Sequence, residues 1–234
     1  MADPAKIEVL RSLGKMVRGL STLFWGLPAT MIIYVETARM DWLDFFGAWG
    51  MIPAVVLSAI LWRGLDQLRH FQKQERVWQQ SLNQAEIFVL INLGLSPFLF
   101  WWHRMPNVLF YNICISLLGL SGLLLLVQLN HVLRRLVAML PDENLRAETS
   151  LFTGFNIAMF FALFIGQSAY FALQQMSNLP SLLGYVLAII GNNGLGLALF
   201  LILMPLALTM ALLWKTKEVI FTSVFESEVP DRNQ

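Results

Sequence analysis

A few polar side chains that could bind a neutral molecule lie in a part of the chain that is otherwise almost entirely apolar. Residues 149–214 contain no Asp, Glu, Lys, Arg or His. Four polar residues within them are separated by 11, 3 and 4 positions: Asn156, Gln167, Tyr170 and Gln174. On a helix these four fall within about 60° of one another, so they share one face. Amide and phenol groups in hydrocarbon need hydrogen-bond partners, and this face is therefore expected to meet protein, water or a substrate rather than lipid.

Two explanations of this polar face remain open. Hydrogen bonds between membrane helices are common and are worth about 0.6 kcal/mol each, so helix packing is the simpler explanation. The alternative is the lining of a polar path or substrate site.

A second set of polar positions lies in the last apolar segment. Asn192 and Asn193 stand between two glycines at 191–194, which is poor helix sequence, and Pro205 follows. Several transporters place substrate sites at an unwound stretch of a broken membrane helix. A long unbroken helix, or a short interfacial helix before the true span, is the simpler alternative.

The fourth apolar window carries a further pattern. Cys114, Ser121 and Gln128 recur every seven residues, with Gly119 and Gly122 close by. Small residues at such spacing allow helices to approach closely, so we expect this face to pack against another helix.

Residue types that carry out catalysis or bind cofactors form no recognisable pattern. Gly-x-Ser-x-Gly, His-Glu-x-x-His and Walker-type motifs are missing from the sequence. The three histidines, His70, His103 and His131, are not expected at matched depth on neighbouring spans, which argues against haem ligation. We therefore expect no enzyme activity, no catalytic residue, no metal and no cofactor. A lipid-modifying enzyme using Asp142, Glu143 and Glu148 is the weakest option, because acids at a helix start have a simpler explanation.

The elements that position these residues follow from composition. The 234-residue chain is 57% hydrophobic and 13% charged, whereas charged residues make up about a quarter of a globular domain. Two membrane-crossing helices joined by a short polar turn explain the uncharged stretch at 149–214. We predict an all-α polytopic membrane protein in contact with membrane lipids. A net charge of +1 offers no basic surface for nucleic acid.

Windows without charge predict about six transmembrane helices, arranged as three hairpins. They are residues 19–35, 45–62, 87–102 with an extension back to 82, 105–130, 151–173 and a span within 181–214. In this arrangement all but two of the 16 Lys and Arg residues, Arg39 and Arg104, lie on one side. The positive-inside rule then predicts that both termini are cytoplasmic, and we expect a bacterial inner (plasma) membrane.

The predicted organisation has three parts. Residues 1–18 form a basic amphipathic segment, lying either on the membrane surface or as a solvated start of the first span. Residues 19–214 form the membrane domain, with helix-forming cytoplasmic hairpins at 63–82 and 131–149, and residues 215–234 form a cytoplasmic tail. These hairpins carry the candidate partner-binding residues: Arg69, Lys73, Arg76, Arg134 and Arg135.

Two functional hypotheses follow. The leading one is a non-enzymatic subunit or scaffold of a larger membrane complex, which docks a protein partner through its cytoplasmic hairpins. The alternative is a transporter or channel component for a small neutral or lipid-like substrate. Its path would run between the polar face of the fifth span and Asn192 and Asn193.

Overall fold

The protein is built from helices throughout the part of the chain that the structure describes. The computed structural model describes the backbone of residues 4–39, 41–71, 74–140, 142–174 and 181–226, and fewer side chains near the ends of these ranges. The elements, in chain order, are α1 (Pro4–Arg39), the 3₁₀ segment η1 (Asp41–Met51), α2 (Ile52–Arg69), α3 (Arg76–Leu95), α4 (Pro97–Arg104), α5 (Leu109–Ala138), α6 (Glu143–Gln174) and α7 (Ser181–Glu226).

Six helical stretches within the described residues are long and apolar enough to cross a membrane. They are Arg11–Arg39, Phe45–Arg69, Arg76–Arg104, Leu109–Ala138, Glu143–Gly166 and Phe200–Thr222. The third combines α3 with the short α4, which begins at Pro97 immediately after the buried Ser96. The prediction of an all-α multi-pass protein with six spans is confirmed.

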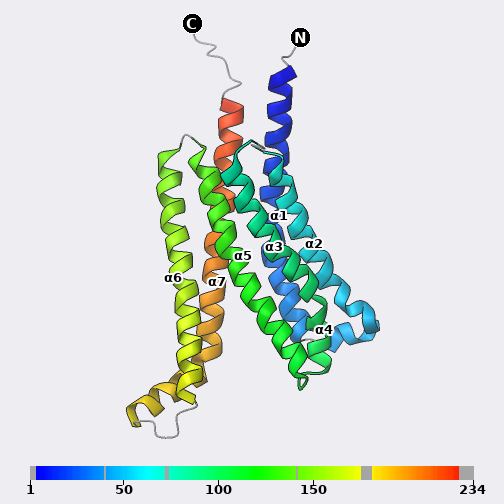
Figure 1. The fold of residues 1–234 in the computed structure, drawn as a ribbon, viewed down its shortest axis with the longest axis vertical. Coiled ribbons are helices and arrows are strands. Elements are labelled where there is room, and N and C mark those ends of the chain that lie inside the picture. Colours follow the sequence, from blue (N-terminus) through cyan, green and yellow to red (C-terminus); the bar gives the residue numbers. More distant parts are fainter. Residues whose placement is uncertain (1–3, 40, 72–73, 141, 175–180, 227–234) are drawn as a thin grey trace.

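The helices run up and down as antiparallel pairs (Figure 1). α1 packs on α2, α3 on α5, and α6 on α7, and the first and last helices, α1 and α7, also pack together. Both chain ends lie at one end of the molecule, together with the α2–α3 and α5–α6 connections. The last turns of α1 and α6, the starts of η1 and α7, and the α4–α5 connection lie at the opposite end.

Most helices at the end that carries the termini continue past the uncharged windows. α1 is one helix from Pro4, so residues 4–18 run into the first span without a break. α2 continues to Arg69 and α3 begins at Arg76, while α5 continues to Ala138 and α6 begins at Glu143. The Asp142 side chain accepts a 3.0 Å hydrogen bond from the Leu145 N–H, which satisfies one of the free donors at the start of α6.

α1 and α2 approach each other through glycines. A Cβ placed on Gly19 would lie 2.8 Å from the Gly64 carbonyl oxygen, and one on Gly26 would lie 2.9 Å from Leu61 Cδ2. Small residues give membrane helices this close contact, which replaces the hydrophobic effect as the source of packing energy in lipid. Leucines from α1, α2, α3, α5 and α7 form the surrounding core.

α7 is a single helix through the Gly191–Gly194 stretch, with Pro205 inside it. The unwound stretch of the transporter hypothesis is therefore not seen in the backbone. Figure 1 shows the first part of α7 turned at an angle to the remainder. The side chains of residues 181–199 lie outside the described part of the structure.

Candidate functional site

An apolar groove of about 540 Å³ lies between α1, α3, α4, α5 and α7, with Leu61 of α2 also in its wall. The residues on α1 that line it run from Leu27 to Arg39, which corresponds to a length of about 18 Å at 1.5 Å per residue. Its inner end is lined by Leu126 of α5 and Leu206 of α7. Its outer end lies at the exposed Arg39, at the end of the molecule opposite the chain termini. The groove therefore combines a long apolar surface with a cation at one end.

The polar groups along the groove bond mainly to the protein itself. Thr30 Oγ1 donates to the Gly26 carbonyl at 2.7 Å, and the Tyr34 hydroxyl lies 2.6 Å from Ser58 Oγ. The carbonyl oxygen of the Asn92 side chain accepts from Ser121 Oγ. With these groups engaged, the groove suits a hydrocarbon chain better than a polar solute.

Two glycines of α5 form part of the groove wall. A Cβ added to Gly119 or Gly122 would meet no atom within 4 Å. The prediction that these glycines serve close helix packing is wrong, because they face open space in the groove. The same prediction is confirmed for Ser121 and Gln128, which bond to α3: Gln128 Nε2 donates to the Ser81 carbonyl at 3.2 Å.

A second polar site lies where α5, α6 and α7 meet. Asn156, one of the four residues of the predicted polar face, is 2% exposed, and its Nδ2 donates to Thr209 Oγ1 at 3.2 Å. Asn130 of α5 donates to the same oxygen at 2.8 Å. Asn156 therefore forms a hydrogen bond between helices, which is the simpler of the two explanations given for the polar face. Asn156 lines a small cavity beside Pro205 and is not among the residues of the groove.

The structure does not describe the other side chains of the predicted polar path, so their positions relative to Asn156 are not given. Gln167, Tyr170 and Gln174 lie in the helical backbone of α6, and Asn192 and Asn193 in that of α7. All five side chains lie outside the described residues. Sequence reasoning did not single out Thr30, Tyr34, Asn92, Asn130 or Thr209. Their one signal is that each is an uncharged polar residue within an apolar window.

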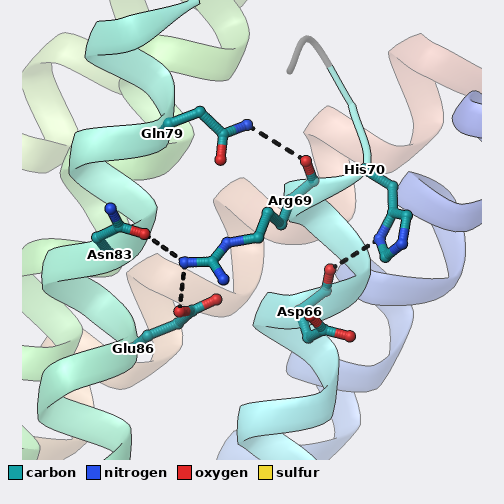
Figure 2. Close-up of polar contacts among 6 residues, drawn as sticks. All are labelled: Asp66, Arg69, His70, Gln79, Asn83 and Glu86. Carbon is teal, nitrogen blue, oxygen red and sulfur yellow. Dashed lines mark hydrogen bonds and ion pairs between the residues drawn. The ribbon is translucent and has the colours of Figure 1, made fainter. Parts of the chain in front are cut away.

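A third polar cluster joins α2 to α3 (Figure 2). Arg69 Nη2 lies 2.8 Å from Glu86 Oε2 and also donates to Asn83 Oδ1. Gln79 Nε2 donates to the Arg69 carbonyl at 3.2 Å, and the His70 ring donates to the Asp66 carbonyl at 3.1 Å. The guanidinium of Arg69, a predicted partner-binding residue, therefore already bonds to Glu86 and Asn83 of the same chain.

The other candidate partner-binding residues differ from Arg69 in their surroundings. Arg76, Arg134 and Arg135 are exposed, and Lys73 lies outside the described residues. Arg134 and Arg135 follow two fully buried residues of α5, Val132 and Leu133, so the turn that carries them is held by packing.

Comparison with known proteins found no matching protein-family model, curated protein or solved structure. Among the side chains that the structure describes, no group of three or more His, Cys, Asp or Glu residues could hold a metal ion. Function must therefore be argued from the sites themselves.

Proposed function

We propose that this protein binds a lipid-like amphiphile in the groove between α1, α3, α4, α5 and α7, as a transporter or a component of one. The observation that carries the proposal is the groove itself, whose volume of about 540 Å³ lies within the range of about 300–1,000 Å³ found for ligand sites. It lies along membrane-spanning helices, where only an apolar molecule enters at low cost.

Arg39 suggests how the ligand is oriented. An exposed guanidinium at the outer end of the groove suits an anionic head group, because arginine forms paired hydrogen bonds with phosphate and carboxylate. The hydrocarbon chain would then extend toward Leu126 and Leu206. The ligand class is an amphiphile with an anionic head and at least one long apolar chain.

The experiment tests this proposal by replacing glycines in the groove wall with leucine, which reduces the space for a ligand. Gly119→Leu and Gly122→Leu add a side chain to the groove wall, at positions where the first added atom, Cβ, meets no atom within 4 Å. Gly94→Leu is the matched control, because Gly94 is exposed on α3, has equal free space and lies outside the groove. Each protein is purified in mild detergent, and its bound lipids are measured by native mass spectrometry.

We expect the two groove variants to lose the co-purifying lipid that wild type and Gly94→Leu retain. The same variants should slow movement of a fluorescent anionic lipid between leaflets of proteoliposomes. Equal lipid binding by all four proteins would overturn the proposal. Loss of binding with no lipid movement by wild type would leave a lipid-binding protein that is not a transporter.

We also propose, as a second candidate, a subunit that docks a protein partner through the turn that carries Arg134 and Arg135. This second proposal is supported by two exposed arginines on a helical turn of α5 that is fixed by its buried neighbours. A surface that is already ordered loses little entropy on binding. Under the positive-inside rule this turn is cytoplasmic, as are both termini, in a bacterial inner membrane. Charge reversal of both arginines should remove a stoichiometric partner from an affinity purification. An unchanged set of co-purifying proteins would count against it.

A further inference from the structure

One side chain in the wall of the groove has hydrogen-bonding capacity that the protein does not use. Asn92 of α3 is 5% exposed and lines the groove. The Oδ1 end of its amide bonds to Ser121 of α5, whereas the Nδ2 end has no partner among the described residues. Both ends of a buried amide are normally paired, because an unpaired end has given up its hydrogen bonds to water without replacement.

The free end of this amide is open to the groove. Four buried side-chain atoms without a partner are sealed from solvent within the described residues, among them the amide oxygens of Asn130 and Asn156. Asn92 Nδ2 is not one of the four, so it keeps contact with open space. The groove is the cavity whose wall includes Asn92. A ligand that fills the groove can therefore contact this amide.

The other polar side chains inward of Arg39 have no hydrogen left for a ligand. Thr30 Oγ1 donates its hydrogen to a backbone carbonyl of α1. Ser58 Oγ donates to a backbone carbonyl of α2 at 2.8 Å, so the Tyr34 hydroxyl must donate to Ser58. Among the described residues of the groove wall, Asn92 is thus the one inward of Arg39 with an unused N–H group.

The depth of Asn92 follows from a contact at the outer end of the groove. The His103 ring of α4 donates to the Ala38 carbonyl at 3.2 Å, so His103 is level with Arg39, the next residue of α1. From His103 back to Asn92 the chain runs through α4 and α3, which corresponds to about 16 Å at 1.5 Å per residue. Asn92 therefore lies well inside the groove, toward its inner end.

The neighbouring helix α5 gives nearly the same depth. Trp102 Nε1 donates to Asn112 Oδ1 at 2.6 Å, which places Asn112 close to the outer end of the groove. Ser121 is level with Asn92 because the two side chains share a hydrogen bond. The stretch of α5 from Asn112 to Ser121 corresponds to about 14 Å. The two paths together place Asn92 about 15 Å inward of the outer end.

A hydroxyl group is the partner that fits this amide. It accepts a hydrogen bond from Nδ2. It also fits the amide turned over, with Oδ1 toward the groove, because a hydroxyl donates as well and Ser121 can give its hydrogen to the Leu118 carbonyl at 3.0 Å. A hydroxyl enters an apolar site at far lower cost than a charge.

We infer that the ligand of the groove carries a hydroxyl group about 15 Å from its anionic head, and that Asn92 selects it. This inference rests on the proposed function, in which Arg39 binds the head. C–C bonds of about 1.5 Å in an extended chain advance about 1.3 Å per carbon, so the hydroxyl belongs near the twelfth carbon. The ligand class is then an anionic amphiphile with an oxygen in the middle of its chain.

The test compares three carboxylates that differ only in a hydroxyl group: stearate, stearate with a hydroxyl on its twelfth carbon, and the isomer with the hydroxyl on its third carbon. The full-length protein in detergent receives equal amounts of stearate and one hydroxylated acid. Native mass spectrometry measures the ratio of the bound acids. Relative to stearate, wild type should bind the twelfth-carbon acid about fivefold more than the third-carbon acid, as one added hydrogen bond predicts.

Two substitutions separate recognition of the ligand from helix packing. Asn92→Leu and Ser121→Ala both break the hydrogen bond between α3 and α5. Only Asn92→Leu removes the amide from the groove wall, since Ser121 is not among the groove residues. We expect the preference for the twelfth-carbon acid to be lost in Asn92→Leu and kept in Ser121→Ala. The comparison of the two isomers in wild type needs no variant to fold.

Three outcomes would overturn the inference. Equal binding of the two isomers by wild type would leave the free amide to water. A preference that Asn92→Leu keeps would place the recognition elsewhere, and one that Ser121→Ala also loses would assign it to helix packing. In each case, binding of stearate that Gly119→Leu prevents would still support the proposed function. Binding of none of the three acids by wild type would count against the proposed function as well.

Discussion

Arg69 and Glu86 hold the second and third spans together, with 2.8 Å between Arg69 Nη2 and Glu86 Oε2. The Glu86 side chain is 12% exposed and that of Arg69 is 43% exposed, so the carboxylate depends on the arginine for its charge partner. Asn83 of α3 accepts from the same nitrogen. The contact joins the last turn of α2 to α3 across a short connection.

Removal of the arginine should destabilise the protein more than removal of the carboxylate. Arg69→Gln leaves a largely buried charge without its partner, whereas Glu86→Gln leaves a neutral amide. Because Arg69 is partly solvated, we expect a loss of about 1–3 kcal/mol for Arg69→Gln. The measurement is thermal unfolding in detergent, followed by tryptophan fluorescence. The exposed Arg76→Gln serves as control and should change stability by less than about 0.5 kcal/mol.

The glycine contact between α1 and α2 should not tolerate a methyl group. Gly19→Ala would put its Cβ 2.8 Å from the Gly64 carbonyl oxygen, and the backbone must move to relieve the clash. Overpacking of this kind costs about 1–3 kcal/mol. Gly14→Ala on the same helix meets no atom within 4 Å and should stabilise the helix by up to about 1 kcal/mol. Equal unfolding midpoints for the two variants would contradict the close contact.

Arg39 should select the head group of a bound lipid. Arg39→Gln removes the cation from the outer end of the groove and leaves the apolar wall intact. An exposed ion pair is worth up to about 1 kcal/mol, so the ratio of anionic to neutral lipid bound should fall by about fivefold. Arg104→Gln is the control, since Arg104 stacks on Phe100 and is not among the groove residues. The ratio is read by native mass spectrometry after exchange into mixed-lipid nanodiscs, and an unchanged ratio would remove Arg39 from the proposal.

Thr209 should stabilise the junction of α5, α6 and α7. Thr209→Val keeps the shape of the side chain and removes the oxygen that both Asn130 and Asn156 bond. At about 0.6 kcal/mol for each bond between membrane helices, we expect a loss of about 1–2 kcal/mol, measured by unfolding in detergent. Thr222→Val on the same helix removes only a bond to the helix's own Glu218 carbonyl and should have little effect. Similar losses for both variants would argue against a shared bond across helices.

Sequence reasoning located the spans because their signal is local. A charge within a window of about 20 residues is costly in lipid, so uncharged windows have to coincide with membrane helices. The helix-forming segments at 63–82 and 131–149 indicate that α2 and α5 continue into polar sequence, but not that these helices end at Arg69 and Ala138.

The groove could not be derived in this way because no single helix contains it. Tyr34, Asn92 and Gly119 are separated by dozens of residues, and they line one groove only because α2, α4 and α7 each pack on α1 and connect it to the α3–α5 pair. Gly119 shows the difficulty most clearly. The sequence shows that this face of the helix carries small side chains. Whether such a face packs against a neighbouring helix or borders open space depends on where the other helices lie.

The contact between α1 and α7 also determines when the protein can acquire its groove during synthesis. Leu27 in the first helix and Ile202 in the last both line the groove, and they lie 175 residues apart in the sequence. A nascent chain that has inserted five spans has neither the Ile202 wall nor the Thr209 oxygen that Asn130 and Asn156 share. Such an intermediate leaves both amides facing lipid or solvent. The last helix therefore completes both the wall of the groove and the hydrogen bonds of these two amides.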